Sequence, residues 1–183
     1  MESSLTFLLL PVGFPGEVLV TLARRAREAM PFPSLWLAST DPLEPPIEAY
    51  SWERMQFDAE KVNEHIHSVL YDYVREGIRI IGVVDADGYI PGFNFVFGLA
   101  STALGVATVY TRRLKTGGNG LYMERLLKEV LHEAGHLLGL DHCSNRECVM
   151  SFSRSVEEVD RKAPLFCSSC KAKLVLKYGS RGQ

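Results

Sequence analysis

Apolar and polar residues alternate with two different periodicities along the first two thirds of the chain. Residues 5–13 (LTFLLLPVG) form a continuous apolar run, which predicts a buried strand, whereas 16–30 repeat apolar residues at helical spacing. A short strand is expected at 34–39, and the Pro- and acid-rich segment 40–51 is typical of a surface loop. The chain is therefore expected to begin with a strand, a helix and a second strand.

The middle of the chain continues this alternation. Residues 58–77 predict one helix, with Asp58 as its N-cap and Gly77 at its end. Three further strand-like segments are expected within 78–88, 93–101 and 105–113. This order indicates an α/β (α+β) fold in which helices pack against a twisted, mixed, mainly parallel sheet.

The last third of the chain combines a long helix with an irregular tail. The four residues GGNG (117–120) break the chain before a helix that is expected to begin near Leu121. The regular pattern then fades, and the remaining residues contain all four cysteines of the chain. We expect a single domain over 1–183, with an upper lobe at 1–139 and a small irregular lower lobe at 140–183 that needs a further element to stabilise it.

Composition and charge exclude several classes of protein. Hydrophobic residues make up 46% of the chain and charged residues 23%, which is typical of a globular protein. A net charge of −2 and the lack of a dense basic run argue against nucleic acid or a membrane as a partner. The first 14 residues carry Glu2 and no basic residue, unlike a secretory signal, so we expect a cytoplasmic protein.

The long helix carries a motif that favours a metal site. His132 and His136 are four residues apart, so their imidazoles lie one turn apart and can reach the same point. Glu133 lies beside this pair, close enough to contact a ligand of the metal without binding the metal itself. This arrangement suits a zinc hydrolase, although two histidines at this spacing can also be a solvated pair and HEAGH alone arises by chance.

The residues that follow make the motif more specific. Gly139 suits the left-handed backbone conformation that ends a helix and turns the chain sharply. His142 comes three residues later and can return to the metal as a third ligand. Three protein ligands leave a fourth position open for water, so HEAGHLLGLDH predicts a catalytic zinc site.

The four cysteines form two pairs with the spacings C-x₄-C and C-x₂-C. They are Cys143, Cys148, Cys167 and Cys170. Thiolates at these spacings predict a tetrahedral structural zinc. The alternatives are two disulfides, which a reducing compartment disfavours, and a redox C-x-x-C, which lacks its usual place in a βαβ unit. Two zinc ions per chain are therefore expected, with the neighbours His142 and Cys143 each serving one.

The combined string resembles a known family. HEAGHLLGLDHC, followed by CVM at 148–150 and CSSC at 167–170, resembles the archaemetzincins, zinc-dependent metallopeptidases of the metzincin clan. The resemblance implies a metzincin, zincin-like fold with a cleft between its lobes. It also implies that Met150 supports the zinc ligands as the Met-turn residue, although a methionine alone is more often an ordinary core residue. FNFVFG (93–98) would be the edge strand that pairs with an extended peptide.

The function expected from these features is that of a zinc metallopeptidase. It would hydrolyse peptide bonds by a zinc-bound water, with Glu133 as general base and peptides or proteins as substrates. A first alternative is a zinc-stabilised protein that binds peptides or partners with little hydrolysis, because a motif determines geometry and not turnover. A second alternative is a zinc amidohydrolase that acts on a small non-peptide substrate.

Other polar residues receive no functional role at this point. His65 and His67 face apart on their helix, so both are expected at the surface. DADG (85–88) is expected to be a turn, because its resemblance to a calcium loop is incomplete. Arg112 and Arg113 are expected to be solvated.

Overall fold

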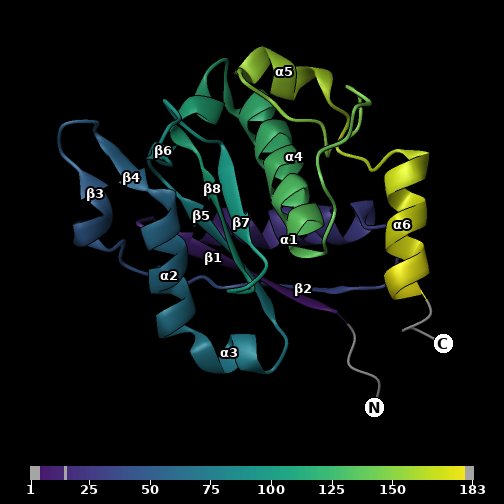
Figure 1. Cartoon of the computed structure of the whole chain (residues 1–183), viewed down its shortest axis with the longest axis horizontal. Coiled ribbons are helices and arrows are strands. Elements are labelled where there is room, and N and C mark those ends of the chain that lie inside the picture. Colours follow the sequence, from purple (N-terminus) through teal and green to yellow (C-terminus); the bar gives the residue numbers. More distant parts are fainter. Residues whose placement is uncertain (1–4, 15, 180–183) are drawn as a thin grey trace.

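The structure is a computed structural model that describes residues 5–14 and 16–179. Its main sheet consists of β1 (Thr6–Val12), β2 (Leu35–Ala38), β5 (Arg79–Val84), β7 (Gly98–Ser101) and β8 (Val106–Tyr110). The strand order is β2-β1-β5-β8-β7 (Figure 1). All neighbours are parallel except β7, which runs antiparallel to β8 at one edge. The twisted mixed sheet expected from the sequence is confirmed.

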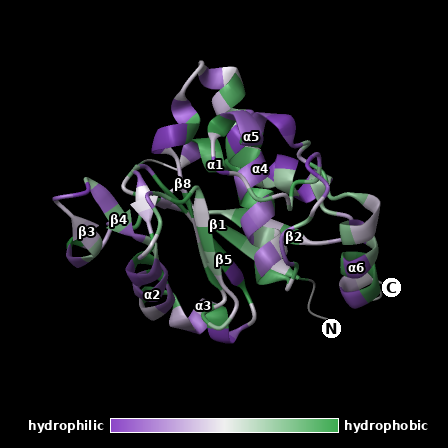
Figure 2. Cartoon of the chain, turned by 45° about the horizontal axis from the view of Figure 1, so that its top comes forward, coloured by the Kyte–Doolittle hydropathy of each residue, from purple (hydrophilic) through white to green (hydrophobic). Residues whose placement is uncertain are grey.

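Helices cover both faces of this sheet. The helices before the lower lobe are α1 (Glu17–Ala29), α2 (Ala59–Val69), α3 (Tyr71–Arg75) and α4 (Asn119–Leu137). One face packs against α1 and α4 and the other against α2 and α3. The central strands β1 and β5 are mostly hydrophobic (Figure 2), because side chains of both their faces enter a core.

A second, smaller sheet lies beside the main one. It contains β3 (Tyr50–Ser51), β4 (Gln56–Asp58) and β6 (Gly88–Tyr89) in that order. The 3₁₀ helix η1 (Ile47–Ala49) directly precedes β3, and a second one, η2 (Arg112–Lys115), follows β8. The segment expected to be a plain surface loop at 40–51 therefore contains η1 and β3. The DADG segment connects β5 to β6 as the expected turn.

The helix expected at 58–77 has the predicted ends but is interrupted. The Asp58 carboxylate accepts hydrogen bonds from the backbone N–H groups of Glu60 and Lys61, at 3.1 and 3.4 Å. Gly77 has a φ of 87°, as expected of a helix-terminating glycine. Leu70, however, adopts φ −111° and ψ 29°, which separates α2 from α3. The second piece has no fully buried residue and contacts the core through the partly buried Val74.

The lower lobe is more regular than the sequence pattern suggests. It contains α5 (Val156–Arg161) and α6 (Ser168–Tyr178), neither of which was predicted. Helix α6 buries Cys170, Leu174 and Tyr178, which are spaced four residues apart. The Tyr178 ring stacks on Phe32 with 5.5 Å between centroids, so α6 is attached to the rest of the molecule. Among the described residues, no helix has both the length and the apolar character needed to cross a membrane.

Candidate metal centres

Helix α4 places the candidate histidines between the sheet and the lower lobe. Its residues Leu126, Val130 and Ala134 are fully buried in the core that α4 shares with the sheet. The helix ends as predicted at Gly139, whose φ of 89° is left-handed and whose N–H donates to the His136 carbonyl at 2.9 Å. The chain then reverses so that His142 returns towards the helix.

The structure brings the three histidines together. The Nε2 atoms of His132 and His136 lie 3.0 Å apart. The His142 ring centroid is 5.3 Å from that of His132 and 4.8 Å from that of His136. One ligand nitrogen of each lies within 4.8 Å of the other two. The trio predicted by the sequence string therefore converges on one point.

Backbone carbonyls orient two of these imidazoles. His132 Nδ1 donates to the Val149 carbonyl and His136 Nδ1 donates to the Leu140 carbonyl, both at 2.8 Å. Since a carbonyl oxygen only accepts, both Nδ1 atoms carry the proton and both Nε2 atoms present lone pairs. Burial lowers the pKa of His132 well below its ordinary value, and it also lowers the pKa of His136 and His142. Neutral imidazoles are the form that binds a metal.

The geometry of the histidines fits a zinc ion. Two lone-pair nitrogens that face each other at 3.0 Å cannot share a hydrogen bond, whereas a cation between them satisfies both. Zinc–nitrogen bonds of about 2.0 Å at the tetrahedral angle separate two nitrogens by about 3.3 Å, close to this distance. Three protein ligands leave one tetrahedral position for a water or a substrate oxygen.

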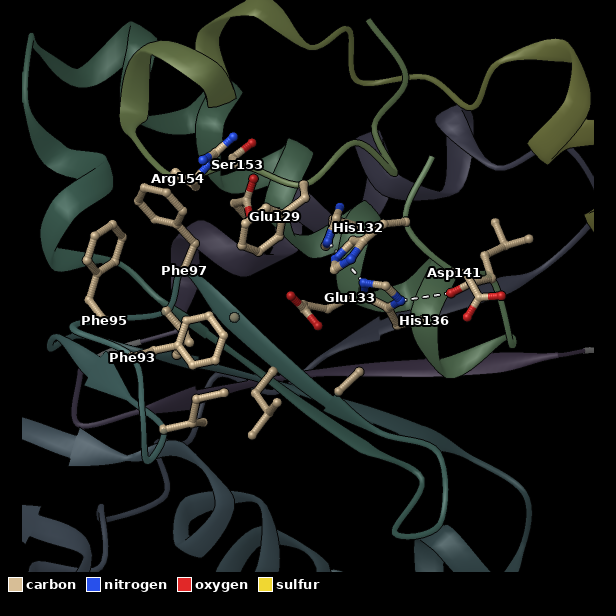
Figure 3. Close-up of a pocket in the computed structure, with 18 of the residues that line it drawn as sticks. Phe93, Phe95, Phe97, Glu129, His132, Glu133, His136, Asp141, Ser153 and Arg154 are labelled. Carbon is tan, nitrogen blue, oxygen red and sulfur yellow. Dashed lines mark hydrogen bonds between the residues drawn. The ribbon is translucent and has the colours of Figure 1, made fainter. Parts of the chain in front are cut away.

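Glu133 lies beside the histidine trio and is almost completely buried. Its side chain points into the space between the histidines and a row of phenylalanines (Figure 3). Its Oε2 atom has no hydrogen-bond partner among the described residues. Burial raises the pKa of this carboxyl well above its ordinary value, and the nearby Glu129 raises it further against the opposing charge of Lys162. The carboxyl is therefore able to take and hold a proton.

Gly98 provides the space that Glu133 occupies. A Cβ atom at Gly98 would lie 2.4 Å from Glu133 Oε1, 2.7 Å from Cδ and 2.8 Å from Cγ. Gly98 pairs regularly with Val109 in the sheet and is not among the glycines with positive φ. The site therefore needs glycine at position 98 because glycine has no side chain, and not because of its conformational freedom.

Met150 packs against α4 at Gly135. It is fully buried, and a Cβ atom at Gly135 would lie 2.3 Å from its Sδ atom. Its carbonyl accepts a hydrogen bond from the N–H of Cys143 at 2.9 Å. Met150 therefore connects the histidine helix to the first residue of the cysteine cluster, and this position suits the supporting role implied by the resemblance.

The four cysteines form a second cluster. The four Sγ atoms all lie within 4.8 Å of one another, and those of Cys143 and Cys167 are 3.8 Å apart. Tetrahedral zinc with bonds of about 2.3 Å separates its sulfurs by about 3.8 Å, so this distance fits. The backbone N–H of Cys170 lowers the pKa of Cys167 to about 7, whereas burial raises the pKa of Cys148 and Cys170. No disulfide joins these cysteines.

A cleft of about 730 Å³ runs past the histidine cluster and not past the cysteines. Its wall opposite the histidines contains Phe93, Phe95 and Phe97 (Figure 3). The edge strand expected at 93–98 is wrong over most of its length, because β7 covers Gly98–Ser101 and residues 93–97 are irregular. Gly98 pairs with Val109, and the Phe97 carbonyl accepts a hydrogen bond at 2.8 Å from the N–H of Tyr110, the last residue of β8. Residues 93–96 therefore extend past the end of β8.

Two ion pairs near the cleft were not predicted from the sequence, one of an exposed arginine with a buried aspartate and one that is buried throughout. Arg113, expected to be solvated, makes a two-pronged hydrogen bond to Asp87 with distances from 2.7 to 3.1 Å. Lys162 donates to Glu129 at 2.8 Å, and both side chains are buried. These partners are 26 and 33 residues apart, so no local signal could have revealed them.

The histidines on the second helix are outside both clusters. His65 and His67 are partly exposed rather than fully at the surface. His67 Nδ1 lies 2.8 Å from the Leu104 carbonyl, to which it donates. Neither residue belongs to a group that could hold a metal among the described residues.

The histidine cluster borders a cleft, and a buried carboxylate lies beside it next to an antiparallel edge strand. This arrangement is typical of metallopeptidases. The model of peptidase family M54 matches residues 19–176. The chain is 99% identical to an archaemetzincin from Aeropyrum pernix over the full length of both. The chain therefore belongs to peptidase family M54, and its expected class of zinc-dependent metallopeptidase is confirmed.

Solved structures agree with this assignment. An archaemetzincin from Archaeoglobus fulgidus, crystallised with malonate, is 32% identical with a TM-score of 0.77 and covers 92% of this chain and 99% of its own. A zinc-dependent peptidase from Methanocorpusculum labreanum is 30% identical in sequence, with a TM-score of 0.77. The match covers 91% of this chain and 99% of that protein's chain. The fold expected from the family resemblance is therefore confirmed.

Proposed function

We propose that the histidine cluster hydrolyses peptide bonds, with His132, His136 and His142 as ligands of a catalytic zinc and Glu133 as general base. The observation that carries this proposal is the buried Glu133 carboxylate, whose Oε2 atom has no partner in the described chain and borders the cleft beside the histidines. Leaving a buried carboxylate oxygen unpaired is costly, so it indicates a site prepared for a reacting group.

Different residues of this chain have different roles in the proposed reaction. A bound zinc ion supplies Lewis-acid chemistry, which polarises the scissile carbonyl and lowers the pKa of water. Glu133 removes a proton from the attacking water and passes it to the leaving amine, for which its raised pKa is suitable. The carbonyls of Val149 and Leu140 keep the histidines in the orientation that this reaction needs.

The edge strand β7 is the proposed binding surface for the peptide main chain. Its residues pair with β8 on one side only, and the five-stranded sheet ends with it. An extended peptide can add to such an edge by main-chain hydrogen bonds. The apolar cleft wall then receives its side chains, which favours a peptide over a small polar substrate.

The cysteine cluster is proposed to hold a second, structural zinc through Cys143, Cys148, Cys167 and Cys170. Its support is the close approach of the four sulfurs, within 4.8 Å of one another, and their place outside the cleft. Free thiols in this cluster suit a reducing compartment, so the proposed location is the cytoplasm. A single domain with lobes at 1–139 and 140–183 is proposed because one core cluster contains residues of both, from Leu5 to Tyr178.

Replacement of Glu133 tests this function. Glu133→Ala should lower turnover of a peptide library by about 10²- to 10⁴-fold, the usual contribution of a general base. Elemental analysis should still find both zinc ions, because Glu133 is not a proposed ligand. Glu64→Ala is the matched control, since Glu64 is an exposed residue on the far helix α2.

The outcomes of this experiment separate the alternatives. Undiminished turnover in Glu133→Ala would contradict the proposed mechanism. A zinc-loaded wild-type protein that binds peptides without cleaving them would favour the peptide-binding alternative.

A further inference from the structure

The cleft wall opposite the histidines is an irregular segment, residues 93–97, here called the aromatic wall. The Phe95 and Phe97 rings meet edge to face with 5.1 Å between their centroids. Its main-chain contacts with the described strands are an isolated bridge between Val96 and Gly88 and a hydrogen bond from the Tyr110 N–H to the Phe97 carbonyl at 2.8 Å. A wall with so little strand pairing needs other contacts to hold its shape.

Two side chains of the small sheet hold the backbone of this wall. Arg54 donates from Nη2 to the carbonyls of Phe93 and Asn94, at 3.0 and 3.1 Å. Gln56, a buried residue of β4, donates from Nε2 to the Asn94 carbonyl at 2.9 Å. The Arg54 guanidinium also lies over the Tyr89 ring, 4.3 Å from its centroid, which keeps it in place.

An ion pair between the buried Asp87 and the partly exposed Arg113 also contacts this wall. Asp87 is buried, and its carboxylate accepts hydrogen bonds from Arg113 and, at 3.1 Å, from the second N–H of Gln56. The Arg113 guanidinium lies 4.0 Å from the centroid of the Phe95 ring. One connected network therefore contacts the wall at its backbone and at an aromatic ring.

These polar residues are separate from the reaction centre. None of Arg54, Gln56, Asp87 and Arg113 lines the cleft, and none contacts a histidine of the cluster. In the part of the chain that the structure describes, they contact the cleft lining through the aromatic wall. A guanidinium fork on a buried carboxylate is a rigid contact, so it is suited to keeping a wall in one position.

We propose that Asp87 and Arg113, together with Gln56 and Arg54, are positioning residues that set the selectivity of the cleft. By holding the aromatic wall in place they favour substrates with an aromatic or branched aliphatic side chain next to the scissile bond. This inference rests on the proposed peptidase function and gives the small sheet a role in it.

The test compares peptides that carry Phe or Ala on each side of the scissile bond. The measured quantity is the ratio of kcat/KM for Phe over Ala, at the position where the wild type discriminates most. Arg113→Gln should lower this ratio about tenfold, the order of discrimination that an apolar pocket provides, with turnover of the Ala peptide kept within about twofold. Arg112→Gln is the matched control, because Arg112 neighbours Arg113 in η2 and is exposed as Arg113 is.

A second variant protects the test against loss of folding. Arg54 is exposed, so Arg54→Met should fold and should lower the same ratio about threefold by removing two bonds to the wall. If circular dichroism shows that Arg113→Gln is unfolded, Arg54→Met decides the question. A wild-type ratio in the folded variants, or an equal loss for both peptides, would overturn the inference.

A binding experiment distinguishes failure of this inference from failure of the proposed function. Calorimetry in the Glu133→Ala background, with and without Arg113→Gln, gives the Kd ratio of the same two peptides. If the wild type cleaves no peptide, and this Kd ratio still depends on Arg113, the proposed function fails and the inference holds. If peptides are cleaved and neither ratio depends on Arg113 or Arg54, the inference fails and the proposed function holds.

Discussion

The histidine cluster ends at His142 and the cysteine cluster begins at Cys143, yet these two candidate metal sites differ in almost every property. The histidine cluster has three candidate ligands, borders the cleft and has a buried carboxylate beside it. The cysteine cluster has four candidate ligands, of which Cys148 and Cys170 are buried, and lies outside the cleft. Ligand number and surroundings, and not distance along the chain, therefore separate an open site from a closed one.

The two clusters also differ in what holds them. The histidines stand on a buried helix and are oriented by carbonyl groups. The cysteines come from three short segments of the lower lobe, where the N–H of Cys167 donates to Cys148 Sγ at 3.3 Å. The first cluster is supported by the core, whereas the second is expected to support the lobe that contains it.

The largest effect is expected from breaking the cysteine cluster. Cys167→Ser should remove the structural zinc and cost on the order of 5 kcal/mol of unfolding free energy, since such sites contribute about 10–16 kcal/mol in small zinc domains. Zinc affinity at the histidine site should also fall by about tenfold or more, because Cys143 no longer holds the neighbouring His142. Chelator competition and elemental analysis measure both losses. The control is Ser169→Ala, and unchanged affinity at the histidine site would refute the coupling.

Breaking only the histidine side requires a smaller change, at Gly98. Gly98→Ala should displace the Glu133 carboxylate and lower kcat by about 10²-fold, the cost of a misplacement of about 1 Å, while both zinc ions stay bound. Gly120→Ala is the matched control, because a Cβ atom there meets nothing within 4 Å. Full activity in Gly98→Ala, measured at saturating peptide, would show that Glu133 tolerates the methyl group.

The link between α4 and the lower lobe can be weakened at Lys162. Its Nζ donates to Glu129 at 2.8 Å and to the Ser151 carbonyl at 3.3 Å. Lys162→Met leaves the Glu129 carboxylate buried and unpaired, so unfolding in urea should show a loss of about 3–5 kcal/mol. The double variant with Glu129→Leu should recover part of this loss. A double variant as unstable as the single one would argue against the ion pair as the cause.

The smallest effect concerns the acid stability of the same link. The two-pronged hydrogen bond from Arg125 lowers the pKa of Asp160 below its ordinary value. Because the folded pKa is lower than the unfolded one, this carboxylate stabilises the fold above about pH 3.9 and loses its contribution as the pH falls through the lowered value. Asp160→Asn should therefore flatten the acid limb of the unfolding free energy, while Asp41→Asn, at an exposed position, should leave it steep.

The histidine cluster was predictable because its geometry is local. His132 and His136 share a helix face, and one left-handed glycine accounts for the return of His142. Helix α6 was not predictable in the same way. Its buried residues form a narrow stripe, and Leu176 on the same helix is 88% exposed, so the apolar pattern does not mark one face.

Contacts between distant segments were beyond the reach of pattern analysis. Arg113 has the sequence context of a solvated arginine, and only the packing of η2 beside β6 gives it Asp87 as a partner. The start of β7 has the same explanation. Its apolar pattern begins at Phe93, but the end of β8 at Tyr110 decides where pairing stops.

The anchors of His132 and His136 are main-chain oxygens, at Val149 and Leu140. Every amino acid carries this oxygen, so a point substitution at either position changes the side chain and leaves the acceptor. Lineages can therefore exchange one apolar residue for another at both places without turning the imidazoles. Only an insertion, a deletion or a shift of the loop itself removes the anchor, which makes this centre robust to sequence drift.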